Sequence, residues 1–327
     1  MTNVVLLGLK GHQGCCLDEI ARREDVRLAG VQDDDPTVLE GLRGRSYTDQ
    51  QTLFTTSPDE LLALPQVDVA ILCEDNAARP GNLLACAERG WHIMAEKPLA
   101  LSLEDLGAVR EAVERAGVRL SMLLTMRFEP PYLAMRHEVA AGSVGRPLLM
   151  SAQKSYRRGI RPAWQRDRAT FGGTIPFIGI HALDMLQWQT GCRYRRVAAA
   201  HHNERLPGAG DIEETAIMLL ETDAGQMVDI RCDYLRPGKA PTHGDDRFRV
   251  AGSDGVIEAI GGEVSLLTAA HEPRVLAQPE GQSIFGSFLD ELAGRGRHPI
   301  TAAECFAITE VALKARQAAE TGEWVSV

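Results

Sequence analysis

The 327-residue sequence lacks a long apolar run, an excess of basic residues and any C-x-x-C motif. No hydrophobic stretch approaches the roughly 20 residues that a membrane-spanning helix requires. The opening residues, Met1-Thr2-Asn3 followed by Val4, lack the basic region and cleavage site of a signal peptide. The formal net charge of −10 argues against nucleic acid as a partner, because phosphate binding requires a basic surface. We therefore expect a cytoplasmic protein with neither a nucleic-acid nor a membrane partner.

The seven cysteines are scattered along the chain, and none stands in a C-x-x-C pair. An odd, unclustered set makes neither a disulfide framework nor a zinc site, so we expect reduced thiols and no bound metal. His201 and His202 lie in a strand-like run and are not expected to bind a metal either. The chain length and the 44% of hydrophobic residues predict two packed domains.

The first third of the chain alternates strand and helix patterns. Apolar runs predict strands at residues 4–7, 26–31, 67–73, 91–95 and 118–124, with helices between them. Ser57 and Ser102 are each followed three residues later by an acidic side chain, a pattern that caps the start of a helix. Strands that alternate with helices imply right-handed βαβ units. Residues 1–125 are therefore predicted to form an α/β Rossmann domain, with a doubly wound parallel sheet.

The pattern changes after about residue 126, where strands become frequent. A helix is predicted at 131–141. Short glycine-containing turns predict two hairpins, which pair residues 215–221 with 226–233 and residues 247–251 with 256–260. Helices at 283–293 and 302–321 close the chain. We therefore predict that residues 126–327 form an α+β domain with a mostly antiparallel sheet.

A glycine-rich run, Gly8-Leu9-Lys10-Gly11-His12-Gln13-Gly14, directly follows the first predicted strand and opens the first predicted helix. Glycines let the backbone approach a pyrophosphate, and the helix N-terminus presents free N–H groups to it. The spacing is G-x-x-G-x-x-G instead of the usual G-x-G-x-x-G, so an ordinary glycine-rich turn is the alternative. Asp33, at the end of the second strand, favours a dinucleotide, because its carboxylate can accept hydrogen bonds from the adenosine ribose. That charge would repel a 2′-phosphate, so the predicted cofactor is NAD, while Lys10 leaves NADP open.

Glu96-Lys97-Pro98 follows the fourth predicted strand, at the edge of the sheet where doubly wound folds bind ligands. Burial and the cationic ring of an oxidised nicotinamide would both favour the neutral form of a lysine at this position, which could then accept a proton. The alternative is that Lys97 only pairs with Glu96. We take Lys97 as the candidate catalytic base.

Several motifs follow one another in a characteristic order along the chain. They are Tyr-Thr-Asp at 47–49, Val-Asp-Val-Ala at 67–70, Trp-His-Ile-Met-Ala-Glu-Lys-Pro-Leu-Ala at 91–100, Arg-Phe-Glu-Pro at 127–130, Gly-Ser-Val-Gly-Arg-Pro at 142–147, and Gly-Ile-His-Ala-Leu-Asp at 179–184. This ordered set, which spans nearly the whole chain, resembles the glucose–fructose oxidoreductase, inositol dehydrogenase and rhizopine-catabolism (Gfo/Idh/MocA) family.

The resemblance implies a Rossmann domain and an α+β domain whose large open sheet often forms dimers or tetramers, with the active site between the two. It implies that Lys97 contacts nicotinamide and the substrate hydroxyl, that the bond before Pro98 is often cis, and that His181 hydrogen-bonds the reacting oxygen. Further residues are expected to contact the cofactor (Glu74, Asn76, Glu96 and Trp164) or the substrate (Arg127, Tyr156, Arg157, Trp164 and Asp184).

Three departures from the family pattern affect the predicted site. Phe177 stands where the family carries an aspartate one helical turn before His181. A phenyl ring cannot relay a proton, so the proton-transfer set is reduced to Lys97 and His181, aided by Asp184. The family's asparagine before Arg127 is replaced, and its T-P-N loop becomes Glu74-Asp75-Asn76. The extra carboxylates either favour a cationic substrate or hydrogen-bond ribose.

An arginine-rich stretch contains Arg157, Arg158, Arg161 and Arg166. It suggests an anionic substrate such as a sugar acid, with a solvated loop or a subunit contact as equal alternatives. The function predicted is hydride transfer between a nicotinamide and a secondary alcohol or ketone of a sugar, cyclitol or sugar acid. Two alternatives remain: a cofactor-binding regulatory protein that has lost the reaction, and a lyase- or glycosidase-like enzyme with a transient redox step.

Overall fold

The computed structural model describes residues 1–327, and the contacts within the chain divide it into two units. The first unit comprises Met1–Leu123 and Ser283–Ala307. The second comprises Leu124–Gln282 and Ile308–Val327. The segment Ser283–Ala307 therefore groups with the N-terminal residues, although it follows most of the second unit in the chain.

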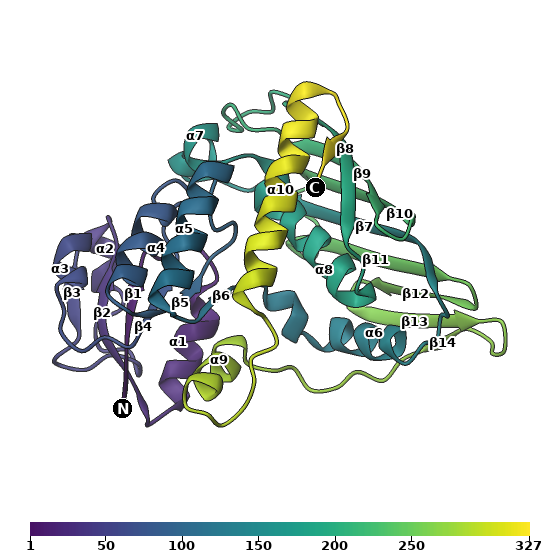
Figure 1. Ribbon diagram of the computed structural model, residues 1–327. Helices are drawn as coiled ribbons and strands as arrows, with labels where there is room; N and C mark the ends of the chain where they lie inside the picture. The colour runs from purple at the N-terminus through teal and green to yellow at the C-terminus, as the bar shows by residue number, and fades with distance from the viewer. The chain divides into compact units, whose positions relative to one another are not determined.

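The first unit contains a six-stranded sheet in the order β3-β2-β1-β4-β5-β6, in which every strand pair is parallel. Its strands are β1 (Thr2–Leu7), β2 (Val26–Gln32), β3 (Leu53–Thr55), β4 (Val69–Leu72), β5 (His92–Ala95) and β6 (Leu120–Met122). Its helices are α1 (Gln13–Arg22), α2 (Pro36–Glu40), α3 (Pro58–Leu62), α4 (Arg79–Glu88), α5 (Leu103–Ala116) and α9 (Ile284–Leu292). Helices α4 and α5 pack together, as do α1 and α9 (Figure 1). The predicted Rossmann architecture is confirmed.

The strand order of this sheet fixes where ligands can bind. The chain runs outward from β1 through β2 to β3, and then returns to β4 on the other side of β1. The carboxyl ends of β1 and β4 therefore form the switch point at which doubly wound sheets bind ligands. The last four residues of β1 and all of β4 are apolar and buried, as expected at the centre of a parallel sheet.

Local sequence explains where helices α3 and α5 begin and where α5 ends. Ser57 and Ser102 have extended backbones, and their side chains accept hydrogen bonds from the N–H groups of Glu60 and Asp105, as the capping pattern predicts. Gly117 ends α5 in the left-handed conformation, with φ of 65°, which glycine adopts without strain.

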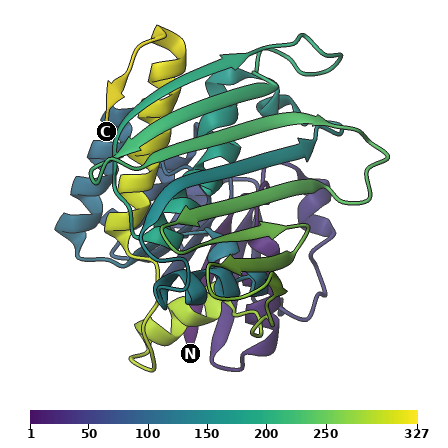
Figure 2. The same cartoon turned by 90° about the vertical axis from the view of Figure 1, so that its right-hand side faces the viewer.

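The second unit contains a nine-stranded sheet in the order β14-β13-β12-β11-β7-β10-β9-β8-β15 (Figure 2). Its strands are β7 (Pro147–Arg157), β8 (Tyr194–His202), β9 (Thr215–Thr222), β10 (Met227–Arg236), β11 (Gly244–Gly252), β12 (Gly255–Ile260), β13 (Glu263–Thr268), β14 (Arg274–Val275) and β15 (Val325–Ser326). Only β7 and β10 pair in parallel; all other pairs are antiparallel. Both predicted hairpins, β9–β10 and β11–β12, are confirmed.

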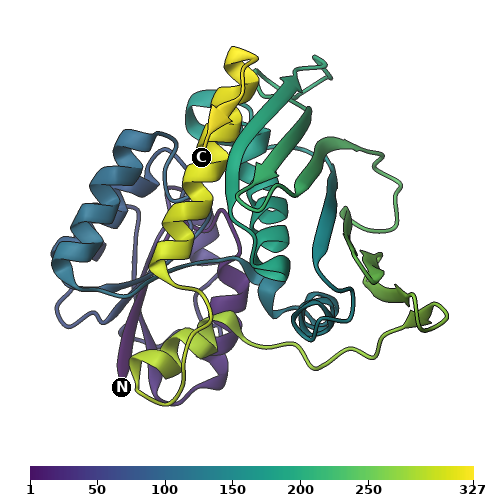
Figure 3. The ribbon, with the colours of Figure 1, turned by 45° about the vertical axis from the view of Figure 1, so that its right-hand side comes forward.

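Helices cover one face of this sheet and leave the other open. Helices α6 (Pro130–Ala140) and α8 (Ile180–Thr190) contact its strands, and Figure 3 shows α8 lying along the sheet. Residues alternate accordingly: Met218 and Leu220 of β9 are buried, while Ile217 and Leu219 are exposed. The remaining helical elements are short turns at Thr125–Phe128 and Ala163–Gln165, helix α7 (Arg168–Phe171), a π-helical turn at Ile175–Gly179, and α10 (Ala302–Thr321), which runs from the first unit into the second.

Three further features bear on the chemistry that the chain can support. None of its helices has both the length and the hydropathy that crossing a bilayer requires. All seven cysteines are free thiols, and only Cys15 is partly exposed. No three His, Cys, Asp or Glu side chains converge in a way that could hold a metal ion.

Candidate active site

The glycine-rich loop crosses the carboxyl ends of β2 and β4. The N–H of Gly8 donates to the carbonyl of Gln32 at 2.7 Å, and the N–H of Lys10 donates to the carbonyl of Cys73 at 2.8 Å. Gly8 has a φ of 76°, and a Cβ at this position would lie 2.4 Å from Cα of Glu74. Only glycine therefore allows the loop to lie this close to the end of β4.

The first turn of α1 has the features that a pyrophosphate needs. The side chain of Gln13 accepts a hydrogen bond from the N–H of Gly11 at 2.9 Å and donates one to the carbonyl of Leu9 at 3.1 Å, which fixes the loop. A Cβ at Gly14 would meet no atom within 4 Å, so open space lies beside the helix N-terminus. Open space beside the positive end of a helix dipole suits an anionic group, so these residues fit a dinucleotide.

Asp33 lies at the end of β2, as predicted, and is only 4% exposed. One carboxylate oxygen accepts the N–H of Leu9 at 2.9 Å, and the other accepts the N–H of Asp35 at 3.0 Å. A carboxylate can accept about four hydrogen bonds, so capacity remains for ribose hydroxyls. Asp33 thus also holds the glycine loop against β2.

Lys10 is already engaged by acidic side chains. Its Nζ lies 2.9 Å from Asp34 and 3.7 Å from Asp75. Burial lowers the pKa of Lys10, but the hydrogen bond and charge of Asp34 and the charge of Asp75 outweigh burial, so the pKa is raised overall. The side chain remains a cation whose charge is compensated within the loop region.

Glu96 joins the loop to the segment that carries Lys97. One of its oxygens accepts the backbone N–H of His12 and contacts the ring of that histidine, and the other accepts the N–H of Lys97 at 3.1 Å. A Cβ at Gly11 would overlap Glu96, so this glycine is needed for the contact. Burial opposes ionisation of Glu96, but the charges of His12, Lys97 and Arg79 outweigh burial and lower its pKa to about 2. Glu96 is therefore a carboxylate at neutral pH.

The loop after β4 behaves differently. Glu74 is buried, neither of its carboxyl oxygens has a hydrogen-bond partner, and burial raises its pKa to about 7 despite the nearby charge of Arg79.

Arg79 was not identified from the sequence. It is 1% exposed and donates to the side chain of Asn76 at 2.9 Å and to the carbonyls of Pro98 at 2.6 Å and Glu74 at 2.8 Å. Arg79 thus fixes Asn76 and links the end of β4 to the segment after β5.

Lys97 lies two residues after the end of β5 and is 3% exposed, so it is not a surface charge. The Lys97–Pro98 peptide bond is cis, as the resemblance implies. Because β2, β1, β4 and β5 are neighbours in a parallel sheet, Asp33, the glycine loop, Glu74 and Lys97 all lie at the same edge. The structure thus brings together the predicted residues of the first unit.

In the second unit, His181 lies in the first turn of α8 and is 5% exposed. The π-helical turn at Ile175–Gly179 directly precedes it, and such turns often occur at functional sites. Phe177, within that turn, packs against Phe171 and Trp164, with ring centroids 4.4 and 6.1 Å away. An aromatic cluster thus occupies the position where the resemblance leads one to expect an aspartate.

Arg127 and Asp184, both predicted substrate contacts, form a buried ion pair with each other. Two hydrogen bonds of 3.0 and 2.6 Å join the guanidinium to the two carboxylate oxygens. Each side chain is 2% exposed. The pair anchors α8 to the turn at Thr125–Phe128, which gives both residues a structural role. Their contact with substrate stays a prediction.

The end of β7 carries Tyr156 and Arg157, two further predicted substrate contacts. Arg157 donates to the carbonyl of Gly238 at 3.2 Å. Lys154, also on β7, was not assigned a role from the sequence. It is completely buried, pairs with Asp246 of β11 and lies 5.1 Å from the centre of the Tyr156 ring. No local sequence pattern indicates that the charge of Lys154 is balanced by a carboxylate 92 residues later in the chain.

Comparisons with known proteins agree with this architecture. The family model described as "Oxidoreductase family, NAD-binding Rossmann fold" matches residues 3–124, and the "GFO/IDH/MocA C-terminal domain" model matches residues 132–258. Inositol 2-dehydrogenase 2 of Saccharopolyspora erythraea is 30% identical over 208 residues, which are 63% of this chain and 58% of that protein. The NAD(+)-dependent scyllo-inositol 2-dehydrogenase of Bacillus subtilis is 27% identical over 62% of this chain and 58% of its own length. The chain thus aligns with little more than half of each of these dehydrogenases.

A solved structure extends the likeness to the full length. An oxidoreductase from Thermotoga maritima is 31% identical and superposes with a TM-score of 0.94 over 99% of this chain and 100% of its own. The two family models match one unit each and follow the same order. The chain belongs to the Gfo/Idh/MocA oxidoreductase family, and its N-terminal unit is the family's NAD-binding Rossmann domain.

Proposed function

We propose that this protein is an NAD-dependent oxidoreductase that transfers a hydride between nicotinamide and a secondary alcohol or ketone of a sugar, cyclitol or sugar acid. The observation that carries the proposal is the buried Lys97 at the sheet edge that also holds the glycine loop and Asp33. A buried lysine beside a dinucleotide loop is suited to proton transfer. The inositol dehydrogenases among its relatives act on substrates of the proposed class.

In the oxidative direction, Lys97 Nζ removes the proton of the substrate hydroxyl. His181 donates a hydrogen bond to the same oxygen and steadies it as charge develops. NAD, when bound, supplies the hydride acceptor. The protein residues contribute alignment and proton transfer. Tyr156, Arg157 and Trp164 are proposed to line the substrate site, while Arg127 and Asp184 act by positioning α8.

The cofactor choice follows from charge. Asp33 lies where the ribose hydroxyls of the adenosine bind in Rossmann domains, and its carboxylate repels a 2′-phosphate. Lys10 could meet such a phosphate, but it is paired with Asp34 and Asp75. We therefore propose NAD over NADP, with Gly14 at the pyrophosphate and Glu74, Asn76 and Glu96 on the nicotinamide side.

Three coarser features belong to the same proposal. A homodimer or homotetramer is supported by the open sheet face, where Ile217, Leu219, Ile260 and Leu267 are all exposed. A cytoplasmic location is supported by the seven free cysteines. A domain boundary near residue 125 is supported by the break between the two family matches, with Ser283–Ala307 as a later addition to the N-terminal unit.

The aromatic cluster around Phe177 favours one alternative: a protein that binds cofactor and ligand without turnover. The test is absorbance at the reduced-nicotinamide band, with the purified protein, NAD and a panel of inositols, sugars and sugar acids. Net NADH formation with at least one compound is the expected result. NAD binding with no reduction by any compound would overturn the proposed reaction. Substrate loss without net reduction would indicate a transient redox step.

A further inference from the structure

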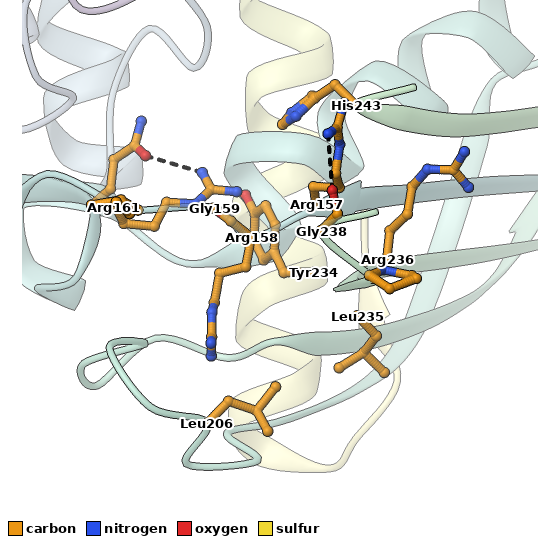
Figure 4. Close-up of a pocket in the computed structure, with 13 residues that line it drawn as sticks. Arg157, Arg158, Gly159, Arg161, Leu206, Tyr234, Leu235, Arg236, Gly238 and His243 are labelled. Carbon is orange, nitrogen blue, oxygen red and sulfur yellow. Dashed lines mark hydrogen bonds between the residues drawn. The ribbon is translucent and has the colours of Figure 1, made fainter. Parts of the chain in front are cut away.

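The second unit contains a cavity of about 670 Å³ at the end of β7 and β10 (Figure 4). Arg157, Arg158 and Arg161 reach it from the end of β7 and the loop that follows, and Arg236 reaches it from the end of β10. Gln165, Tyr234 and His243 complete its polar lining. No aspartate or glutamate lines the cavity, in a chain whose net charge is −10.

The arginines of this cavity are poorly compensated. Arg157 and Arg161 hydrogen-bond only neutral groups, which are the carbonyls of Gly238 and Arg158 and the amide of Gln165. Arg158 and Arg236 each face a single carboxylate at 3.7 Å, which is too far for a hydrogen bond. The cavity therefore holds an excess of positive charge.

Several polar atoms in the lining are buried without a hydrogen-bond partner. They are Nε of Arg157, Nη1 of Arg158, Nη2 of Arg161 and the hydroxyl of Tyr234. Tyr234 is 2% exposed, and the guanidinium of Arg161 lies 4.1 Å above its ring. Buried donors without acceptors are rare in folded proteins, so this set points to a ligand that supplies acceptor oxygens.

The positive charge of the cavity also affects the pKa of His243. Its pKa is lowered by burial first and then by the charges of Arg161 and Arg157. The histidine is therefore mostly neutral at pH 7 and adds a further hydrogen-bonding group rather than a charge. Guanidinium groups donate pairs of hydrogen bonds to the oxygens of a carboxylate or phosphate. A neutral hydroxyl group of a substrate offers neither the charge nor the paired oxygens.

One segment connects this cavity with the residues before His181. Arg161 and Gln165 line the cavity, while Trp164 between them packs against Phe177 in the π-helical turn. A ligand held by the arginines would therefore lie against the same loop that contacts the turn leading into α8. This continuity argues that the cavity serves the substrate and not an unrelated ligand.

We propose that this cavity binds an acidic group on the substrate, so that the protein acts on an anionic polyol, a sugar acid or a sugar phosphate, in preference to a neutral sugar. This inference rests on the proposed oxidoreductase function. Arg161 and Arg158 bind the anion through their unpartnered N–H groups, and Tyr234 donates its hydroxyl to the same group. The substrate's acidic group thereby fixes which hydroxyl is presented for oxidation.

The test compares neutral compounds with derivatives that differ only in the acidic group: glucose with glucuronate and glucose 6-phosphate, and myo-inositol with its monophosphate. The wild-type protein is expected to show kcat/KM at least tenfold higher for an anionic member than for its neutral parent. Arg161→Gln should lower this value about 10- to 100-fold, the effect of losing hydrogen bonds to a charged group, and should change neutral compounds less than twofold. The preferred anion separates carboxylate from phosphate recognition.

Arg166→Gln is the matched control, because this arginine lies in the same loop, is exposed and does not line the cavity. Its kinetics should match those of the wild type. Thermal unfolding of both variants shows whether either has lost its fold. Should Arg161→Gln fail to fold, Arg158→Gln takes its place in the same assays.

Calorimetric titration of gluconate and inorganic phosphate provides a readout that does not depend on turnover. Binding to the wild type that is lost in Arg161→Gln supports the anion site even if no NADH forms, in which case the proposed reaction alone fails. Oxidation of neutral polyols as efficient as that of acids, unchanged in Arg161→Gln, would overturn the anion site while leaving the oxidoreductase function intact.

Discussion

The sheet edge of the first unit and the cavity of the second differ in how their charged side chains are hydrogen-bonded. At the sheet edge, Asp33 and Glu96 accept backbone N–H groups and thereby hold the glycine loop in place. In the cavity, Arg158 and Arg161 keep buried nitrogens without partners. The carboxylates of the sheet edge are already hydrogen-bonded, and their remaining acceptor capacity suits the hydroxyl groups of a cofactor. The buried N–H groups of the cavity lack acceptors, which indicates a ligand that carries acceptor oxygens.

The sheet edge itself contains a second contrast. Glu74 and Glu96 are both buried carboxyls that follow neighbouring strands, yet burial raises the pKa of Glu74 to about 7 and nearby cations bring that of Glu96 to about 2. Glu96 receives hydrogen bonds, and Glu74 receives none. The charges of His12 and Lys97 therefore outweigh burial at Glu96, whereas burial prevails at Glu74.

The largest expected effect concerns Arg127 of the second unit, whose charge, unlike that of the cavity arginines, is paired with a buried carboxylate. Arg127→Met removes the guanidinium from the buried carboxylate of Asp184, which should lower the free energy of unfolding by about 3–5 kcal/mol. Urea denaturation of the full-length chain measures this loss. The double variant Arg127→Met/Asp184→Leu removes both charges and should regain much of the stability. A single-variant loss below about 1 kcal/mol would show that the pair is not the anchor that its geometry indicates.

The next effect tests whether the acids of the sheet edge serve the cofactor. Asp33→Asn should weaken NAD binding about tenfold, because a charged hydrogen-bond acceptor is lost. The ratio of the affinity for NAD to that for NADP should also decrease, because the charge that repels a 2′-phosphate is removed. Fluorescence titration with NADH and NADPH measures both. Asp35→Asn is the control, because the new side chain can still cap α2 at Thr37. An unchanged NADH affinity in Asp33→Asn would exclude the ribose role.

The smallest effect sharpens the contrast between the two buried glutamates. Glu74 keeps its proton in the folded state up to about pH 7, whereas the unfolded chain loses it near the ordinary value of 4.5, so this residue makes stability fall as pH rises between these values. Glu96 acts in the opposite sense: its contribution is complete above pH 4.5 and is lost as pH falls toward 2. Each slope is less than about 1.4 kcal/mol per pH unit, because at most one proton is exchanged.

Unfolding free energies of Glu74→Gln and Glu96→Gln across pH 3–8 give the comparison. Glu74→Gln should remove the fall in stability toward neutral pH, and Glu96→Gln should remove the loss toward acid. Identical pH curves for the two variants would contradict the opposite shifts.

Much of the fold could be predicted because the signals were local. The caps at Ser57 and Ser102, the apolar runs of β1 and β4 and the glycine turns of both hairpins each specify their own element. Gly8, Asp33 and Lys97 could be placed at one sheet edge because each lies within two residues of the end of a strand of the same parallel sheet.

The remaining parts depend on contacts between distant residues. Arg79 bonds the carbonyl of Pro98, and Lys154 pairs with Asp246, but neither partner is marked by any local pattern. Arg127 and Asp184 each resemble a polar site residue in sequence, and only the structure shows that they bond each other. The cavity arginines illustrate the same limit, since their sequence is equally consistent with a solvated loop, a subunit contact and an anion site.

The account is tested most directly by replacing Lys97 with methionine and following both binding and chemistry with the best substrate of the panel. NADH affinity should stay within about threefold of the wild type, since the methionine retains the apolar bulk of the lysine. Turnover should fall at least 100-fold, the scale of positioned acid–base catalysis. Turnover within twofold of the wild type would contradict the assignment of Lys97 as the base and, with it, the proposed reaction mechanism.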